Sequence, residues 1–119
     1  MKYAFENLDV WQKSRVLTKH IYMLTDTFPA DEKFGLTSQL RRATISVSSN
    51  IAEGSTRWGN KEQARFYEIA FGSLIEILNQ LILSNDLKFI ENEDLNELRK
   101  EIETISRMLN ALYKAVKPN

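Results

Sequence analysis

The sequence predicts an all-α fold, an antiparallel four-helix bundle with up-down-up-down topology. Two observations lead to this prediction: apolar residues recur every three or four positions in four stretches, and three short connections separate those stretches. No stretch alternates apolar and polar residues as a half-buried strand does. Helices of about 20 residues joined by short connections pack against their sequence neighbours, which makes each neighbouring pair antiparallel.

A proline separates the first two helices. The first is expected over Leu8–Thr27, and Phe28-Pro29 ends it, because Pro29 has no amide donor and disfavours helical backbone in the residue before it. The loop 29–35 follows. The second helix carries a thin apolar stripe in a segment rich in Ser, Thr and Ala: Leu36, Leu40, Ala43, Val47, Ile51 and Gly54.

Two further breaks delimit the third and fourth helices. Asn60 is expected to cap the third helix, Lys61–Ser84, with Gln63 completing a capping box. Asn92 is expected to cap the fourth helix after a connection over 84–92. The stripe of the third helix is Phe66, Ala70, Leu74, Ile77, Leu78 and Leu81, and that of the fourth is Leu95, Leu98, Ile102, Ile105, Leu109, Leu112 and Val116.

The third helix is apolar on more than one face. Four apolar residues lie off its main stripe: Ile69, Phe71, Ile82 and Leu83. A helix in a lone bundle keeps one polar face, so this helix is either central or covered by another subunit. We therefore expect a homo-oligomer.

Composition indicates one soluble domain over residues 1–119, because 43% hydrophobic and 27% charged residues are ordinary values for a globular chain. The absence of cysteine fits a reducing compartment, and we expect a cytoplasmic protein. No segment is expected to span a membrane. Sixteen basic and sixteen acidic side chains cancel, so any binding of nucleic acid must be local.

The residues offer no catalytic machinery, and we expect neither an enzyme nor a cofactor. His20 is the only histidine, which excludes the paired Glu-x-x-His motifs of di-iron bundles, and it is expected on a solvated or interface face. The four glycines match no phosphate-binding loop. No serine stands beside a histidine base or in a nucleophile elbow.

One end of the bundle is expected to gather basic and aromatic residues. If the first hairpin turns near residue 32, Trp11 meets Glu53 and Ser14 meets Asn50. If the hairpin of the second and third helices turns near Arg57, Asn50 lies near Arg65. Tyr113 of the fourth helix is then expected at the same end of the bundle. The expected cluster is Trp11, Asn50, Glu53, Arg57, Trp58, Lys61, Arg65 and Tyr113.

This cluster allows two interpretations. In the structural one, Asn50 and Glu53 pin the first two helices through hydrogen bonds to Trp11 and nearby backbone amides. In the functional one, the basic residues and an aromatic ring bind phosphates and stack on bases, weakly in one subunit and more strongly in a ring. The residues of this predicted surface are Arg57, Trp58, Lys61 and Arg65.

A second polar contact is expected in the middle of the bundle. The same hairpin pairing brings Glu76 of the third helix close to Gln39 and Arg42 of the second, and we expect an inward Arg42–Glu76 ion pair. Such a pair fixes register, since one carboxylate and one guanidinium form no acid–base couple.

Four separated blocks of the chain resemble the bacterial 23S ribosomal RNA intervening-sequence proteins. They cover nearly the whole chain in order. The blocks are Phe5-x-x-Leu8-x-Val10-Trp11-Gln12-Lys13-Ser14, Phe34-Gly35-Leu36-Thr37-Ser38-Gln39-Leu40-Arg41-Arg42-Ala43, Asn50-Ile51-Ala52-Glu53-Gly54 and Ile69-Ala70-Phe71-Gly72-Ser73-Leu74-x-Glu76.

The resemblance implies a four-helix bundle that assembles as a ring, commonly a homopentamer, with a poorly defined biochemical role. A related branch resembles the accessory protein of diversity-generating retroelements, a basic pentamer that binds nucleic acid and a reverse transcriptase. This chain departs from that basic character, with a pI of about 6.6. The expected partners are structured RNA or an RNA-handling protein. The alternative is a structural or selfish-element protein without nucleic-acid contact.

Overall fold

The structure, a computed structural model, describes residues 1–117. This part of the chain contains four long helices and no strand: α1 (Asp9–Thr25), α2 (Leu36–Ser55), α3 (Asn60–Asp86) and α4 (Asn92–Val116). Two short 3-10 helices, η1 (Ala4–Asn7) and η2 (Ala30–Glu32), precede α1 and α2. The all-α four-helix fold expected from the sequence is confirmed.

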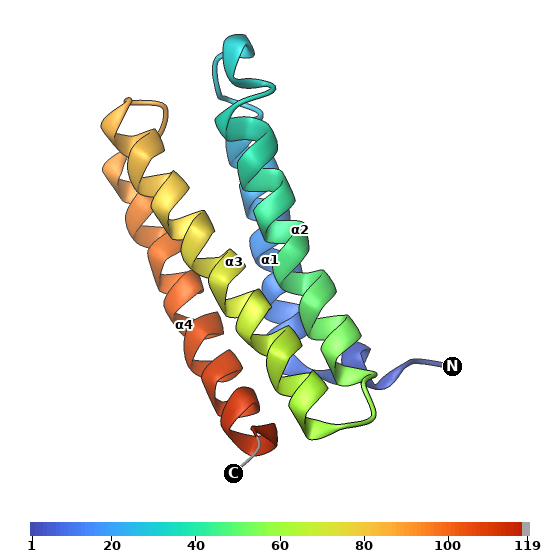
Figure 1. Ribbon diagram of the computed structural model, residues 1–119. Helices are drawn as coiled ribbons and strands as arrows, with labels where there is room; N and C mark the ends of the chain where they lie inside the picture. Colours follow the sequence, from blue (N-terminus) through green and yellow to red (C-terminus); the bar gives the residue numbers. More distant parts are fainter. Residues whose placement is uncertain (118–119) are drawn as a thin grey trace.

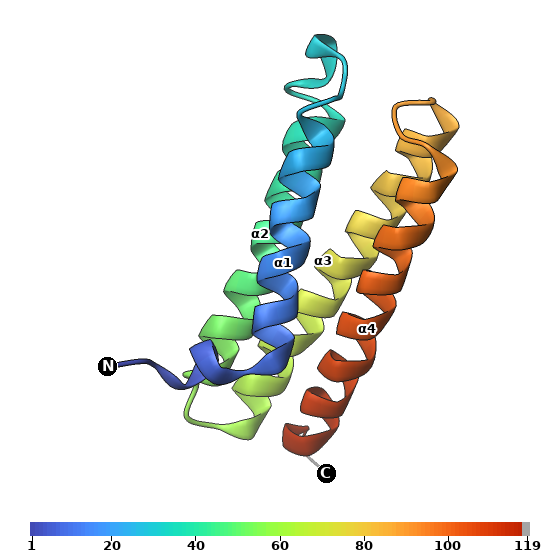
Figure 2. The same cartoon turned by 180° about the vertical axis from the view of Figure 1, so that it is seen from behind.

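The helices lie side by side, and each runs opposite to the one before it (Figures 1 and 2). The first residues of the chain, the α2–α3 connection and the end of α4 gather at one end of the bundle, called here the terminal end. The η2 loop and the α3–α4 turn lie at the opposite, hairpin end. Successive helices therefore pack as neighbours in an up-down-up-down arrangement.

The two hairpins meet mainly through α2 and α3. These two helices pack against each other more extensively than any other pair, whereas α1 and α4 share a thinner seam. Toward the hairpin end the α1–α2 and α3–α4 pairs draw apart in both views. The rings of Phe28 and Phe89, with centroids 5.6 Å apart, still join them there.

Both predicted asparagine caps are wrong by one residue. Asn60 is the first residue of α3, and the extended residue before it is Gly59, which has no side chain to cap the helix. Asn92 is likewise the first residue of α4. The capping box uses Glu91, whose amide donates to Asp94 Oδ2 at 3.1 Å, while the Asn92 amide oxygen accepts a hydrogen bond from Asn85.

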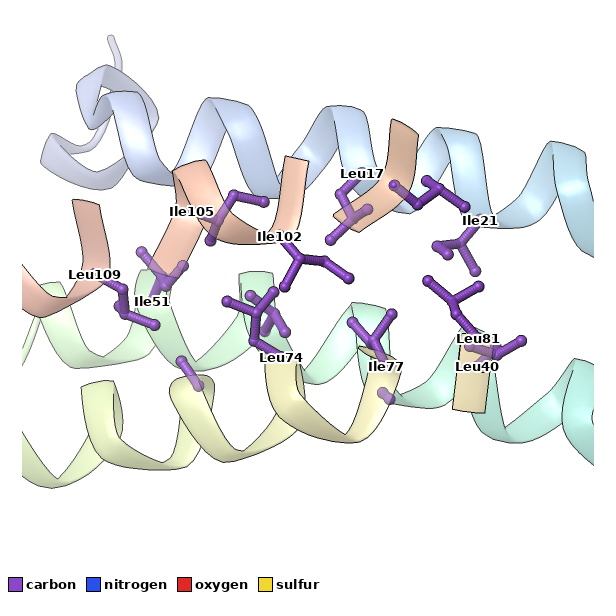
Figure 3. Close-up of a cluster of buried hydrophobic side chains, with 14 of the residues drawn as sticks. Leu17, Ile21, Leu40, Ile51, Leu74, Ile77, Leu81, Ile102, Ile105 and Leu109 are labelled. Atoms are coloured by element: carbon purple, nitrogen blue, oxygen red, sulfur yellow. The ribbon is translucent and has the colours of Figure 1, made fainter. Parts of the chain in front are cut away.

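All four helices contribute to one apolar core, as the stripes in the sequence predict. Figure 3 shows side chains of α1, α2, α3 and α4 meeting between the helices. Complete burial of one leucine or isoleucine side chain stabilises the folded state by about 1.5–3 kcal/mol. The largest fully buried apolar residues are Leu17, Ile21, Leu40, Val47, Ile51, Leu74, Ile77, Leu81, Ile105 and Leu109.

Small residues let α2 approach α3 closely. A Cβ atom at Gly54 would lie 2.8 Å from both the Phe66 Cβ and the Tyr67 ring, so only glycine fits there without a shift. About two turns before Gly54 on α2, the Ser46 hydroxyl lies 2.8 Å from the Ser73 hydroxyl of α3, and the two share a hydrogen bond. The many small residues of α2 are thus explained by this contact.

Helix α3 is 27 residues long and has the length and composition to cross a membrane. A third of its most apolar window is buried against the other helices. The core helix of a soluble bundle has the same length and composition, so these two properties are weak evidence for a membrane span.

Substituting Gly54→Ala should destabilise the protein by about 1–3 kcal/mol, because the added methyl group overlaps Phe66 and Tyr67. The free energy of unfolding in urea measures the loss. Gly72→Ala is the matched control: a Cβ at Gly72 meets nothing within 4 Å, so removing a mid-helix glycine should stabilise α3 by about 0.5–1 kcal/mol. Equal effects of the two substitutions would contradict the close contact.

Candidate functional site

The predicted surface residues gather at the terminal end. Arg57 and Trp58 belong to the α2–α3 connection, and Lys61 and Arg65 lie four residues apart on one face of α3's first turns. All four are exposed. Trp58 is 102% exposed, so the indole packs against nothing in its own chain. A fully solvated tryptophan between cations is the most unusual surface residue of this end.

Arg57, unlike the solvated Trp58, packs on α3. Its guanidinium lies 4.4 Å from the centroid of the Phe66 ring, a cation–π contact. Its amide donates to the Gly54 carbonyl at 3.1 Å and closes the last turn of α2. The arginine therefore keeps a fixed position at the surface, with its outer face open to water.

Charge is segregated along the bundle although the whole chain is neutral. The terminal half, residues 1–17, 46–73 and 105–117, holds nine cations and five carboxylates, and the hairpin half, residues 18–45 and 74–104, holds seven and eleven. The terminal half is therefore net +4 and the hairpin half net −4. The nine cations are Lys2, Lys13, Arg15, Arg57, Lys61, Arg65, Arg107, Lys114 and Lys117, and the five carboxylates are Glu6, Asp9, Glu53, Glu62 and Glu68.

The predicted pin between Trp11, Asn50 and Glu53 is not formed within residues 1–117. The Asn50 amide donates instead to the Ser46 carbonyl of its own helix at 2.8 Å, and Glu53 is exposed. Trp11 packs edge-on against Phe5 of η1, with ring centroids 5.0 Å apart. No pattern in the sequence predicted η1, which provides the ring that the indole contacts.

The pairing of α2 with α3 differs from the one expected. The connection, residues 56–59, does centre on Arg57 and Trp58, but the observed contacts between the two helices are those of a hairpin centred near residue 60. The closest pairs are consequently Ser46 with Ser73 and Gly54 with Tyr67. Asn50 therefore does not lie level with Arg65, which is nearer to the connection.

The predicted Arg42–Glu76 ion pair is also absent from the part of the chain described. Arg42 is exposed, and the Gln80 amide lies between the two helices, donating to Glu76 Oε2 at 3.0 Å and Gln39 Oε1 at 3.2 Å. Glu76 and Gln39 are thus joined through Gln80, one turn further along α3, and form no hydrogen bond with each other. A neutral amide takes the place that the arginine was expected to fill.

The neighbouring Arg41 is the inward-facing arginine, and it clamps α1. Its Nε donates to Thr25 Oγ1 at 2.9 Å, and its second nitrogen reaches Asp26 at 2.9 Å. The guanidinium also lies 4.4 Å from the Tyr22 ring centroid. His20 of α1 and Glu101 of α4 share a hydrogen bond of 2.8 Å between Nδ1 and Oε2, so the single histidine lies exposed on the α1–α4 seam.

A groove of about 320 Å³ lies between α3 and α4 in the terminal half of the bundle, and the sequence analysis did not identify it. Its floor and walls are Tyr67, Glu68, Phe71, Gly72, Leu109, Asn110 and Tyr113. Tyr67 is only 3% exposed, and its burial raises the pKa of the hydroxyl above the usual value. That hydroxyl therefore stays protonated at neutral pH and can donate a hydrogen bond.

Two larger grooves, of about 430 and 450 Å³, flank the His20–Glu101 pair on the α1–α4 seam. Residues 1–117 contain no group of three imidazole or carboxylate side chains placed to hold a metal ion. The aromatic groove on α3 and the exposed cations beside it are thus the most distinctive surface features.

Comparison with known proteins agrees with the fold. A family model described as 23S rRNA-intervening sequence protein matches residues 6–111. A crystal structure from Bacteroides thetaiotaomicron VPI-5482, a protein with unknown function from the S23 ribosomal protein family, superimposes with a TM-score of 0.79. The two sequences are 20% identical, and the match covers 88% of this chain and 98% of that one. No curated protein matches the chain.

Replacing Arg41 with methionine should destabilise the protein by about 1–2 kcal/mol, because hydrogen bonds from a cation to Thr25 and to the Tyr22 carbonyl are lost. Arg42→Met should change the free energy of unfolding by less than about 0.5 kcal/mol, since Arg42 is exposed. Urea unfolding of both variants measures the difference. A larger loss of unfolding free energy for Arg42→Met than for Arg41→Met would contradict this structure and support the Arg42–Glu76 ion pair expected from the sequence.

Proposed function

The chain belongs to the 23S rRNA-intervening sequence protein family, and we propose that it is a non-catalytic, homo-oligomeric binding module for RNA. The terminal end is the proposed contact surface, through Arg57, Trp58, Lys61 and Arg65. The proposed location is the cytoplasm, where structured RNA or an RNA-handling protein is available as a partner. No chemistry is assigned to the chain itself.

The separation of charge is the observation that supports RNA binding best. A neutral chain has no overall attraction for a polyanion, but a terminal half of net +4 attracts phosphates locally. Arg57 is held on Phe66, so little side-chain entropy is lost when it meets a phosphate. The solvated Trp58 ring offers a surface on which a base can stack.

Helix α3 supports the proposal of a homo-oligomer. Ile75 and Leu83 project from the part of its outer face that lies in the hairpin half, and they are 46% and 44% exposed. Burial of these side chains against a second copy would remove apolar surface from water and would leave the terminal half of α3 accessible. The family resemblance suggests a pentamer. A ring would repeat the basic end in each subunit and raise a weak affinity through multivalency.

The alternative is a structural or selfish-element protein that never touches nucleic acid. It accounts equally well for the apolar α3 face, because an assembly needs no ligand. It leaves the solvated Trp58 and the basic terminal half without a role. Measurements of RNA affinity in the intact oligomer distinguish the two functions.

Affinity for a structured RNA hairpin should be measurable at low salt and should fall as salt rises, because binding releases counterions from the phosphates. The double substitution Arg57→Glu with Arg65→Glu should abolish binding and leave the helical circular dichroism unchanged. The matched control reverses two cations of the hairpin end, Lys33→Glu with Lys88→Glu, and should bind as the wild type does. An intact oligomer without affinity at low salt would refute RNA binding.

Substituting Ile75→Glu together with Leu83→Glu should dissociate the oligomer into folded monomers, because a charge in an apolar interface is costly to bury. Sedimentation velocity measures the change in mass. Met23→Glu on α1, at a site 60% exposed, is the control and should leave the assembly intact. A wild-type protein that sediments as a monomer would overturn this part of the proposal.

A further inference from the structure

The groove between α3 and α4 has the character of a small binding site. Phe71 and Leu109 give it apolar walls, and the rings of Tyr67 and Tyr113 line it. Glu68 and Asn110 place a carboxylate and an amide beside these rings. Mostly apolar walls with a few polar groups are the usual composition of a pocket that binds a planar organic group.

Tyr67 is the central residue of this groove. Its ring is held by the close α2–α3 contact, because it packs against the space left by Gly54. The residue is only 3% exposed, but its hydroxyl keeps access to solvent, since the fully buried side-chain polar atom that lacks a partner within residues 1–117 is Gln80 Oε1. Because the ring is buried and lines the groove while the hydroxyl stays accessible, the phenol can donate a hydrogen bond to a molecule bound there.

Gly72 keeps one wall of the groove open. It lies in the interior of the long helix α3, where glycine costs about 1 kcal/mol relative to alanine. No close contact within the chain requires it, since a Cβ there would meet nothing within 4 Å. The groove therefore has room at this position that any larger residue would fill.

Cations flank the groove on both helices. Arg65 precedes Glu68 by three residues and lies on the same face of α3, and Lys114 follows Tyr113 on α4. Both belong to the half of the bundle with net charge +4. A ligand with a planar aromatic part and an attached anion complements this combination of apolar groove and cationic rim.

We propose that the groove of Tyr67, Phe71 and Tyr113 binds an unpaired nucleobase of an RNA strand held at the terminal end. The ring of the base lies between Phe71 and Leu109, the Tyr67 hydroxyl donates to an acceptor on its edge, and Glu68 accepts from an exocyclic amine. Arg65 and Lys114 neutralise the adjoining phosphates. A base within a duplex is stacked and paired and cannot enter, so the site selects single-stranded or bulged RNA. This inference rests on the RNA-binding function proposed above.

The first test compares a short single-stranded oligoadenylate and oligocytidylate with the same strands paired to their complements, at one salt concentration. The wild-type protein should bind the single strands more tightly than the duplexes. Tyr67→Phe removes one unpartnered oxygen and keeps the ring, so the fold should be unaffected. It should weaken single-strand binding by about threefold to tenfold and leave duplex binding unchanged.

The second test fills the groove without disturbing the core. Gly72→Leu places a side chain in the open wall and exchanges glycine for a good helix former, so the protein should become more stable. Single-strand affinity should nevertheless fall by about tenfold or more, while Gly72→Ala keeps most of it. Asn79→Leu adds the same side chain to the same outer face two turns away and is the control for effects on assembly.

The outcomes separate this inference from the function on which it rests. If single strands and duplexes bind equally and neither Tyr67→Phe nor Gly72→Leu changes the affinity, the base pocket is wrong and phosphate binding stands. If no RNA binds at low salt, the proposed function itself fails. Weaker binding of duplex and single strand alike in Tyr67→Phe would indicate a general loss of structure and would also overturn the pocket.

Discussion

The close contact of α2 with α3 is the constraint on which the rest of the molecule depends. Gly54 admits the Tyr67 ring against α2, and the Ser46–Ser73 hydrogen bond holds the same pair of helices further along. This contact fixes the register of the second hairpin and joins the two halves of the bundle. It also turns Tyr67 into the floor of the α3–α4 groove. Packing at one glycine thereby determines both the core and the surface site.

The terminal end shows how one short connection assembles a surface from separate helices. Arg57 closes the last turn of α2 and packs on Phe66, and the extended Gly59 starts α3 immediately afterwards. Lys61 and Arg65 then fall on one face beside it. The start of α3 lies near the end of α4 because these two antiparallel helices have similar lengths, 27 and 25 residues. The surface is a product of topology and needs no excess of basic residues in the chain.

The sequence predicted the helices and their buried stripes well, because apolar periodicity is a local property that each helix carries by itself. Pairing between helices was less predictable. The register of α2 and α3 is set by the contacts of Gly54 with Tyr67 and of Ser46 with Ser73, and this register separates Asn50 from Arg65. Adjacent arginines point about 100° apart on a helix, so Arg41 and not Arg42 turned inward. No pattern within a single stretch of the sequence predicted the groove, because residues of two helices, α3 and α4, line it together.

The segregated charge gives this neutral protein an electric dipole along its long axis. A molecule of this kind turns in the field of a polyanion before contact and arrives with one end first. In the proposed ring, if its helix axes were parallel, the dipoles would add and give one positive rim and one negative rim. Two such rings would attract each other through opposite rims and would stack into columns at low ionic strength, and physiological salt would screen this attraction over about 8 Å.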